Sequence, residues 1–137
     1  MLFGGFQRCL VEPVKFQSNT ERRLAVILER ESEKWLRPAK GQFQIYYKSG
    51  ADHPEYVPDF VAEAQDCIYM LESKARNELG DADVLAKKDV AVKWCGLATA
   101  HTAANGGKAW KYMLIPHDAI SENMTLGGLA SQFLIAG

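Results

Sequence analysis

Three charged residues in the middle of the chain have the types and spacing needed for metal-dependent chemistry on a phosphate group. Asp59 lies in a short run, residues 56–61, and Glu72 and Lys74 lie in a second, residues 67–75; both runs read as β-strands. Side chains two apart on a strand share a face, so Glu72 and Lys74 can approach one atom or ion together. The thirteen positions from Asp59 to Glu72 accommodate a tight turn, which predicts a hairpin with Asp59 beside Glu72.

The chemistry of this trio follows from charge. Magnesium prefers carboxylate and carbonyl oxygens and keeps several waters, so Asp59 and Glu72 suit one ion. Lys74 could orient an attacking water or stabilise charge that builds up on a phosphate. A simpler alternative stays open: Asp59 is an ordinary turn residue after Pro58, and Glu72 and Lys74 form a solvated ion pair of little energetic value. Ser73, between them, has no assigned role.

A third acid lies earlier in the chain, on a helix predicted over residues 18–36. Glu21, Leu24 and Leu28 follow three- and four-residue steps, which places Glu21 on the buried edge of that helix. Ser18 with Glu21 also matches a capping box, in which the Glu21 side chain only returns to the Ser18 amide. Catalysis and capping are both open at this stage.

The remaining pattern predicts alternating helices and strands, and hence an α/β sandwich. Apart from the helix and the two strands above, we expect a strand over 42–47, a helix over 82–104 capped by Asp81, a strand over 109–115 and a final helical stretch over 116–134.

Composition narrows the class of protein. A chain of 137 residues with 47% hydrophobic content and net charge −1 is expected to form one domain, and that charge is unusual for an autonomous DNA binder. It has no apolar run of transmembrane length and no signal-peptide pattern, so we expect a cytoplasmic protein that does not associate with a membrane. Three widely spaced cysteines are expected to remain reduced thiols.

Several segments, in this order, resemble PD-(D/E)xK nucleases, and specifically the carboxy-terminal endonuclease domain of the restriction (Res) subunit of type III restriction enzymes. The resemblance covers most of the chain. The matching segments are residues 16–25, 35–43, 56–61, 72–75 and 87–95. Leu85 departs from the pattern, because many relatives have a glutamine there.

The resemblance implies a three-layer α/β/α restriction-endonuclease-like fold, with a central mixed sheet of about four strands, over residues 16–137. Residues 1–15 would be a leader or the tail of an upstream domain, in a chain cut from a longer protein. It implies magnesium-dependent cleavage of double-stranded DNA, with manganese as a possible substitute. Asp59, Glu72 and Glu21 would be metal ligands and catalytic acids, and Lys74 would be the catalytic lysine.

Partners follow from the same resemblance. The sequence has no glycine-rich nucleotide-binding loop, so ATP would be used only by a helicase domain elsewhere in the parent protein. A modification methyltransferase subunit would supply sequence recognition. Lys87, Lys88 and Arg22 are the residues that we expect to contact DNA. Two alternatives stay open: a repair or recombination nuclease on the same scaffold, and a noncatalytic docking domain.

Overall fold

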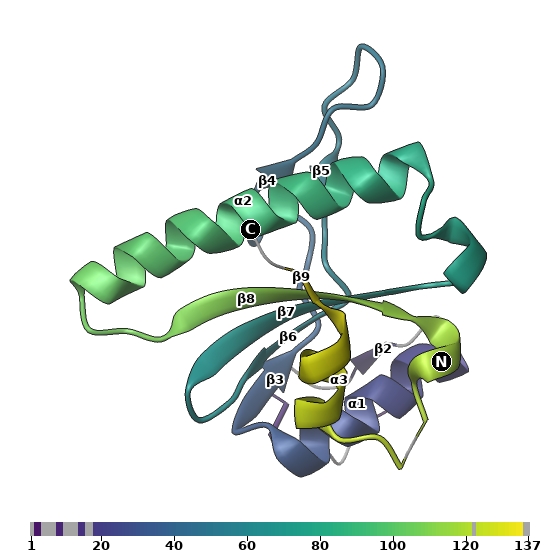
Figure 1. Ribbon diagram of the computed structural model, residues 1–137, viewed down its shortest axis with the longest axis vertical. Helices are drawn as coiled ribbons and strands as arrows, with labels where there is room; N and C mark the ends of the chain where they lie inside the picture. The colour runs from purple at the N-terminus through teal and green to yellow at the C-terminus, as the bar shows by residue number, and fades with distance from the viewer. Residues whose placement is uncertain (1, 4–7, 10–13, 16–17, 122, 136–137) are drawn as a thin grey trace.

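A mixed β-sheet of five strands forms the centre of the part of the chain that the structure describes. The structure is a computed structural model and describes residues 2–3, 8–9, 14–15, 18–121 and 123–135. The sheet order is β3-β6-β7-β8-β9 (Figure 1). The strands are β3 (Lys34–Leu36), β6 (Phe60–Glu63), β7 (Cys67–Lys74), β8 (Ala109–Pro116) and β9 (Leu134–Ile135).

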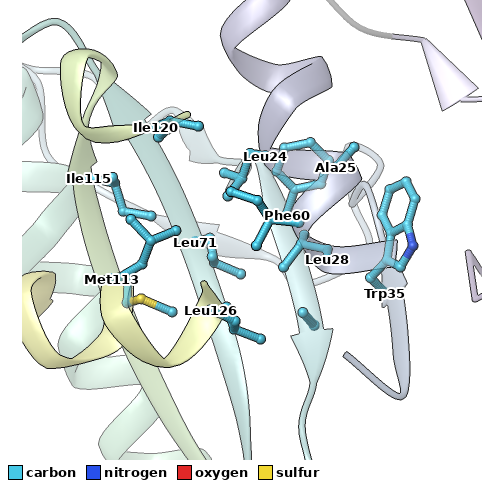
Figure 2. Close-up of a cluster of buried hydrophobic side chains, with 13 residues drawn as sticks. Leu24, Ala25, Leu28, Trp35, Phe60, Leu71, Met113, Ile115, Ile120 and Leu126 are labelled. Atoms are coloured by element: carbon cyan, nitrogen blue, oxygen red, sulfur yellow. The ribbon is translucent and has the colours of Figure 1, made fainter. Parts of the chain in front are cut away.

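Three α-helices cover the two faces of this sheet. Helix α2 (Ala82–Ala104) lies on one face, and α1 (Asn19–Glu31) and α3 (Leu126–Phe133) lie on the other (Figure 1). Two apolar clusters match this arrangement. The cluster under α1 and α3 includes Leu28, Phe60, Leu71 and Met113 (Figure 2). The second cluster, which includes Met70, lies under α2. The predicted α/β class is therefore confirmed.

Strand directions follow from the connections. A short turn joins β6 to β7 and makes them antiparallel, with the Ala64 N–H bonded to the Cys67 carbonyl at 2.8 Å. Helix α2 crosses from β7 to β8 and makes that pair parallel, as a crossover of this length allows. Strand β3 is antiparallel to β6, and β9 is antiparallel to β8. The two longest strands therefore end at the same edge of the sheet.

Two smaller strand pairs lie outside this sheet. Strands β1 (Leu2–Phe3) and β2 (Val14–Lys15) pair antiparallel. Strands β4 (Ile45–Tyr46) and β5 (Glu55–Tyr56) form a second antiparallel pair, whose connecting loop projects past α2 (Figure 1). Short 3-10 helices follow β7 and β8: η1 (Arg76–Glu78) and η2 (His117–Ala119).

The predicted helix over residues 18–36 is too long. Helix α1 ends at Glu31, because the extended Ser32 returns both its N–H and its hydroxyl to the Leu28 carbonyl, at 2.9 and 2.6 Å. Trp35 has the right spacing for the helix but lies in β3, where pairing with Ala62 buries it. The Trp35 indole N–H donates to Glu29 Oε1 at 3.0 Å. Burial of Trp35 against β6 therefore outweighs the helical spacing, and this segment forms a strand.

Four further predictions need correction. The sheet has five strands in the described residues, where about four were expected. The predicted strand over 56–61 is split between β5 and β6, because Pro58 lacks the N–H that a continuous ladder needs. The predicted strand over 42–47 is reduced to β4 and pairs outside the main sheet. The last stretch is not one helix, since η2, α3 and β9 divide it.

Other expectations are confirmed. Helix α2 spans the predicted residues, with Asp81 at its N-cap position, although the Asp81 side chain makes no capping hydrogen bond. Strand β8 extends one residue beyond its predicted end. Cys67 and Cys95 are buried free thiols, and Cys9 is half-buried. Within the described residues, no helix combines the length and the hydropathy needed to cross a bilayer.

Core packing behind the hairpin predicts a contrast between two leucines. Leu71, on β7, is fully buried, whereas Leu97, on α2, has 68% of its surface exposed. We expect Leu71→Ala to lower the free energy of unfolding by about 2–5 kcal/mol, because it opens a cavity in the core. Leu97→Ala should change it by less than about 0.5 kcal/mol. Urea denaturation measures both, and equal effects would contradict this difference in burial between Leu71 and Leu97.

Candidate functional site

The start of β6 and the end of β7 bring Asp59 and Glu72 together. The register pairs Phe60 with Leu71, so its continuation by one residue places Asp59 across from Glu72. The Asp59 Oδ2 atom accepts hydrogen bonds from the Ser73 N–H at 2.9 Å and from the Ser73 hydroxyl at 3.1 Å. The hairpin predicted from the sequence is confirmed. Ser73, which had no assigned role, is the residue that holds Asp59.

Glu72 is a buried carboxylate with polar support. Only 6% of its surface is exposed. The Tyr56 hydroxyl donates to Glu72 Oε1 at 2.7 Å, and the Tyr112 hydroxyl lies 3.2 Å from that of Tyr56. Burial, and then repulsion from Asp59, raises the pKa of Glu72 well above its usual range, although the Tyr56 hydrogen bond and the Lys74 charge oppose this. Positive charge in the cleft would relieve the cost of ionising this group.

A cleft of about 280 Å³ opens at this edge of the sheet. Lys74, at the end of β7, is half-buried and lines it together with both carboxylates. The cleft is lined by Ser18, Glu21, Asp59, Glu72, Ser73, Lys74, Ala75, Glu78 and His117. All four predicted catalytic residues therefore border one cavity, although they come from α1, β7 and the approach to β6.

Glu21 differs from the other two acids because it has its own cation. Its carboxylate forms an ion pair with Arg37, whose guanidinium also lies 5.5 Å from the centre of the Phe60 ring. Its backbone N–H donates to the Ser18 hydroxyl at 3.2 Å, which confirms Ser18 as the helix cap. Ser18 is thus the N-cap of α1, while the Glu21 carboxylate forms its ion pair with Arg37.

The three residues predicted to contact DNA do not belong to the cleft lining that the structure describes. Lys87 lies on α2 with its ammonium 5.4 Å from the centre of the Tyr47 ring. Lys88 is half-buried on the same helix, and Arg22 is half-buried on α1. Their assignment to DNA contact stays a prediction.

Sequence reasoning missed several residues at the site. His117 reaches the cleft because β8 is parallel to β7 and Pro116 pairs with Lys74, so the next residue lies at the same edge. The predicted order of strand, helix and strand, which favours parallel pairing of β7 with β8, was the signal that could have identified His117. Neither Tyr56 nor Tyr112 could be assigned to Glu72 from spacing alone, because the β4–β5 hairpin and β8 approach the carboxylate from distant parts of the chain.

The residues present fit a hard divalent cation that needs only one or two protein ligands. Among the described residues, no three His, Cys, Asp or Glu side chains are close enough to hold a metal ion. Magnesium does not need such a cage, because it is commonly held by one or two carboxylates, with waters and substrate phosphates completing its shell. Asp59 and Glu72 supply those two carboxylates. Zinc, which prefers nitrogen and sulfur ligands, does not match this set.

Comparison of this chain with protein-family models, with curated proteins and with solved structures found no match.

The raised pKa of Glu72 predicts how stability changes with pH. Because the folded protein holds this proton more tightly than the unfolded chain, the contribution of Glu72 to stability falls as pH rises from about 4.5 toward the folded pKa. Glu72→Gln keeps an acceptor for Tyr56 but removes the charge. We expect this variant to gain stability relative to the unmodified protein as pH rises, measured by urea denaturation at pH 4.5 and pH 8.

An exposed acid provides the control for this pH effect. Glu33 forms only a surface ion pair with Lys108, at 3.3 Å. Glu33→Gln should show no gain in relative stability between the two pH values. A stability difference for Glu72→Gln that does not change with pH would contradict the buried, disfavoured charge.

Proposed function

We propose that this chain is a metal-dependent endodeoxyribonuclease domain of the PD-(D/E)xK type, with a restriction-endonuclease-like fold. One observation carries the proposal: Asp59, immediately before β6, lies across from Glu72 on β7, and Lys74 follows Glu72 by two residues and lines the same cleft. The order of α1, β3, β6, β7, α2 and β8 in the chain also supports it. The sequence resemblance contributes the reaction class, which fold alone could not provide.

Each residue of the cleft has a distinct task in this proposal. Ser73 holds Asp59 in place through two hydrogen bonds, and Tyr56 holds Glu72. Both carboxylates face a common volume and can bind magnesium or manganese. The cation, when bound, lowers the pKa of a water and neutralises charge on a phosphate. Lys74 places a positive charge beside the phosphate, where negative charge increases during in-line attack by water.

Glu21 has a secondary task in this proposal. It borders the cleft but is neutralised by Arg37, so it adds little negative charge where a phosphate must approach. We assign the main metal-binding role to Asp59 and Glu72, with Glu21 available to hydrogen-bond a water at the rim.

The wider biological setting belongs to the same proposal. The sequence resemblance implies a type III restriction enzyme, with an ATP-dependent helicase in the same parent protein and a modification methyltransferase partner, and we expect this enzyme to act in the cytoplasm. Net charge −1 agrees with such a setting, because neighbouring domains could hold a weakly binding nuclease on double-stranded DNA.

Plasmid cleavage tests the proposal. The purified chain is incubated at low salt with supercoiled plasmid and millimolar magnesium or manganese, beside Asp59→Asn, Glu72→Gln and Lys74→Ala. We expect nicking by the unmodified chain and a decrease of about 100-fold or more for each variant, because each removes a charge that stabilises the transition state.

Lys34→Ala is the matched control for Lys74→Ala. Lys34 is exposed and lies across from Glu63 in the β3–β6 ladder, near the opposite end of the β6–β7 hairpin. Loss of the Lys34 side chain should therefore leave cleavage within about twofold. Absence of cleavage with either metal, together with no effect of metal on the thermal unfolding of a folded chain, would favour the noncatalytic docking alternative.

A further inference from the structure

Two buried tyrosine hydroxyls lie in a part of the core that is otherwise apolar. Tyr56 and Tyr112 each have 2% of their surface exposed, and their neighbours under α2 include Met70, Val84 and Leu114. Phenylalanine would fill the same volume without requiring a hydrogen-bond partner. The hydroxyl groups therefore need an explanation beyond packing.

The hydrogen bonds between these hydroxyls have one direction when Glu72 is ionised. A carboxylate only accepts, so the Tyr56 hydroxyl must donate its single proton to Glu72 Oε1, at 2.7 Å. Tyr56 then has only lone pairs for its neighbour, and Tyr112 must donate to it across 3.2 Å. The result is a chain from Tyr112 through Tyr56 to Glu72, in which each bond strengthens the next.

This chain also selects which carboxylate oxygen remains for the cleft. Tyr56 occupies Oε1 from the side of α2, and Glu72 itself lines the cleft with Asp59 and Lys74. Partners outside the coordination shell commonly fix the orientation of metal-binding carboxylates in this way. The donors come from β5 and β8, so the orientation of Glu72 depends on two elements besides its own strand.

Resting on the function proposed above, we infer that Tyr56 and Tyr112 are positioning residues, which orient Glu72 so that its second oxygen binds a divalent cation in the cleft. Tyr56 acts directly on the carboxylate. Tyr112 acts only through Tyr56. This order of action distinguishes a positioning role from a general contribution to the core.

Manganese binding by the full chain tests the inference without any need for cleavage. Titration followed by water-proton relaxation compares the unmodified protein with Tyr56→Phe, Tyr112→Phe and the double variant. We expect Tyr56→Phe to weaken manganese binding by about 10- to 100-fold, as loss of an outer partner does at other metal sites. Tyr112→Phe should weaken it less, and the double variant should match Tyr56→Phe, because Tyr112 has no route to Glu72 without the Tyr56 hydroxyl.

Controls separate positioning from folding. Tyr46→Phe removes a hydroxyl from a side chain that is 55% exposed, and should leave manganese affinity unchanged. Thermal unfolding without metal shows whether each variant is folded. The double variant removes both buried hydroxyls, so neither is left without a partner, and it replaces Tyr56→Phe in the comparison if that single variant does not fold.

The outcomes distinguish this inference from the proposed function. If the unmodified chain binds manganese and Tyr56→Phe binds it within twofold as tightly, or if the double variant is clearly weaker than Tyr56→Phe, the positioning role is overturned while the nuclease proposal stands. If the unmodified folded chain binds no manganese at millimolar concentration, both are overturned.

Discussion

The Glu72 carboxylate is buried near the end of β7, at the boundary between the apolar cluster under α2 and the cleft. Most contacts of the site depend on this burial. An ionised carboxylate is costly in such a place unless hydrogen bonds or opposite charge support it. The protein provides a direct hydrogen bond from Tyr56 and a nearby positive charge from Lys74. It also places Asp59 beside Glu72, which adds repulsion. The combination leaves a local excess of negative charge that a cation in the cleft would offset.

Strand pairing explains why these groups meet at one edge. Strand β7 is antiparallel to β6 and parallel to β8, so the start of β6 and the ends of β7 and β8 coincide. The 3-10 helices after β7 and β8 extend this edge. They are joined by two hydrogen bonds from Arg76 to Asp118, at 2.8 and 2.6 Å. Both partners are largely exposed, so this pair contributes little stability but joins the turns that carry Glu78 and His117.

The three acids predicted from the sequence have different electrostatic surroundings in the cleft. Arg37 neutralises Glu21, and Ser73 provides Asp59 with two neutral donors. Glu72 has a neutral donor and a lysine at the end of its own strand. This division is physically reasonable for a site that must accept an anionic phosphate, because three uncompensated carboxylates would repel it. Compensation of Glu21, on α1, by Arg37, just after β3, thus complements the pair of acids on the hairpin.

The sequence by itself determined the β6–β7 hairpin, helix α2, strand β8 and the identity of the central residues. The spacing from Asp59 to Glu72 predicted the β6–β7 hairpin, and Asp81 marked the start of α2, because both signals are local. Asp59, Glu72 and Lys74 could be selected because side chains two apart on a strand share a face, and because a hairpin brings its two strands into register.

Only the tertiary structure decided the conformation of Trp35, the fifth strand of the sheet and the partners of the acids. Trp35 has helical spacing, but it lies in β3, where pairing with β6 buries it almost completely. Arg37 on Glu21, Ser73 on Asp59 and Tyr56 with Tyr112 on Glu72 depend on side-chain orientation, and most of these contacts join segments that are distant in the sequence. The spacing of residues specifies which face of an element a side chain occupies, whereas contacts across layers depend on packing of the whole sheet, and packing is not a local property of the sequence.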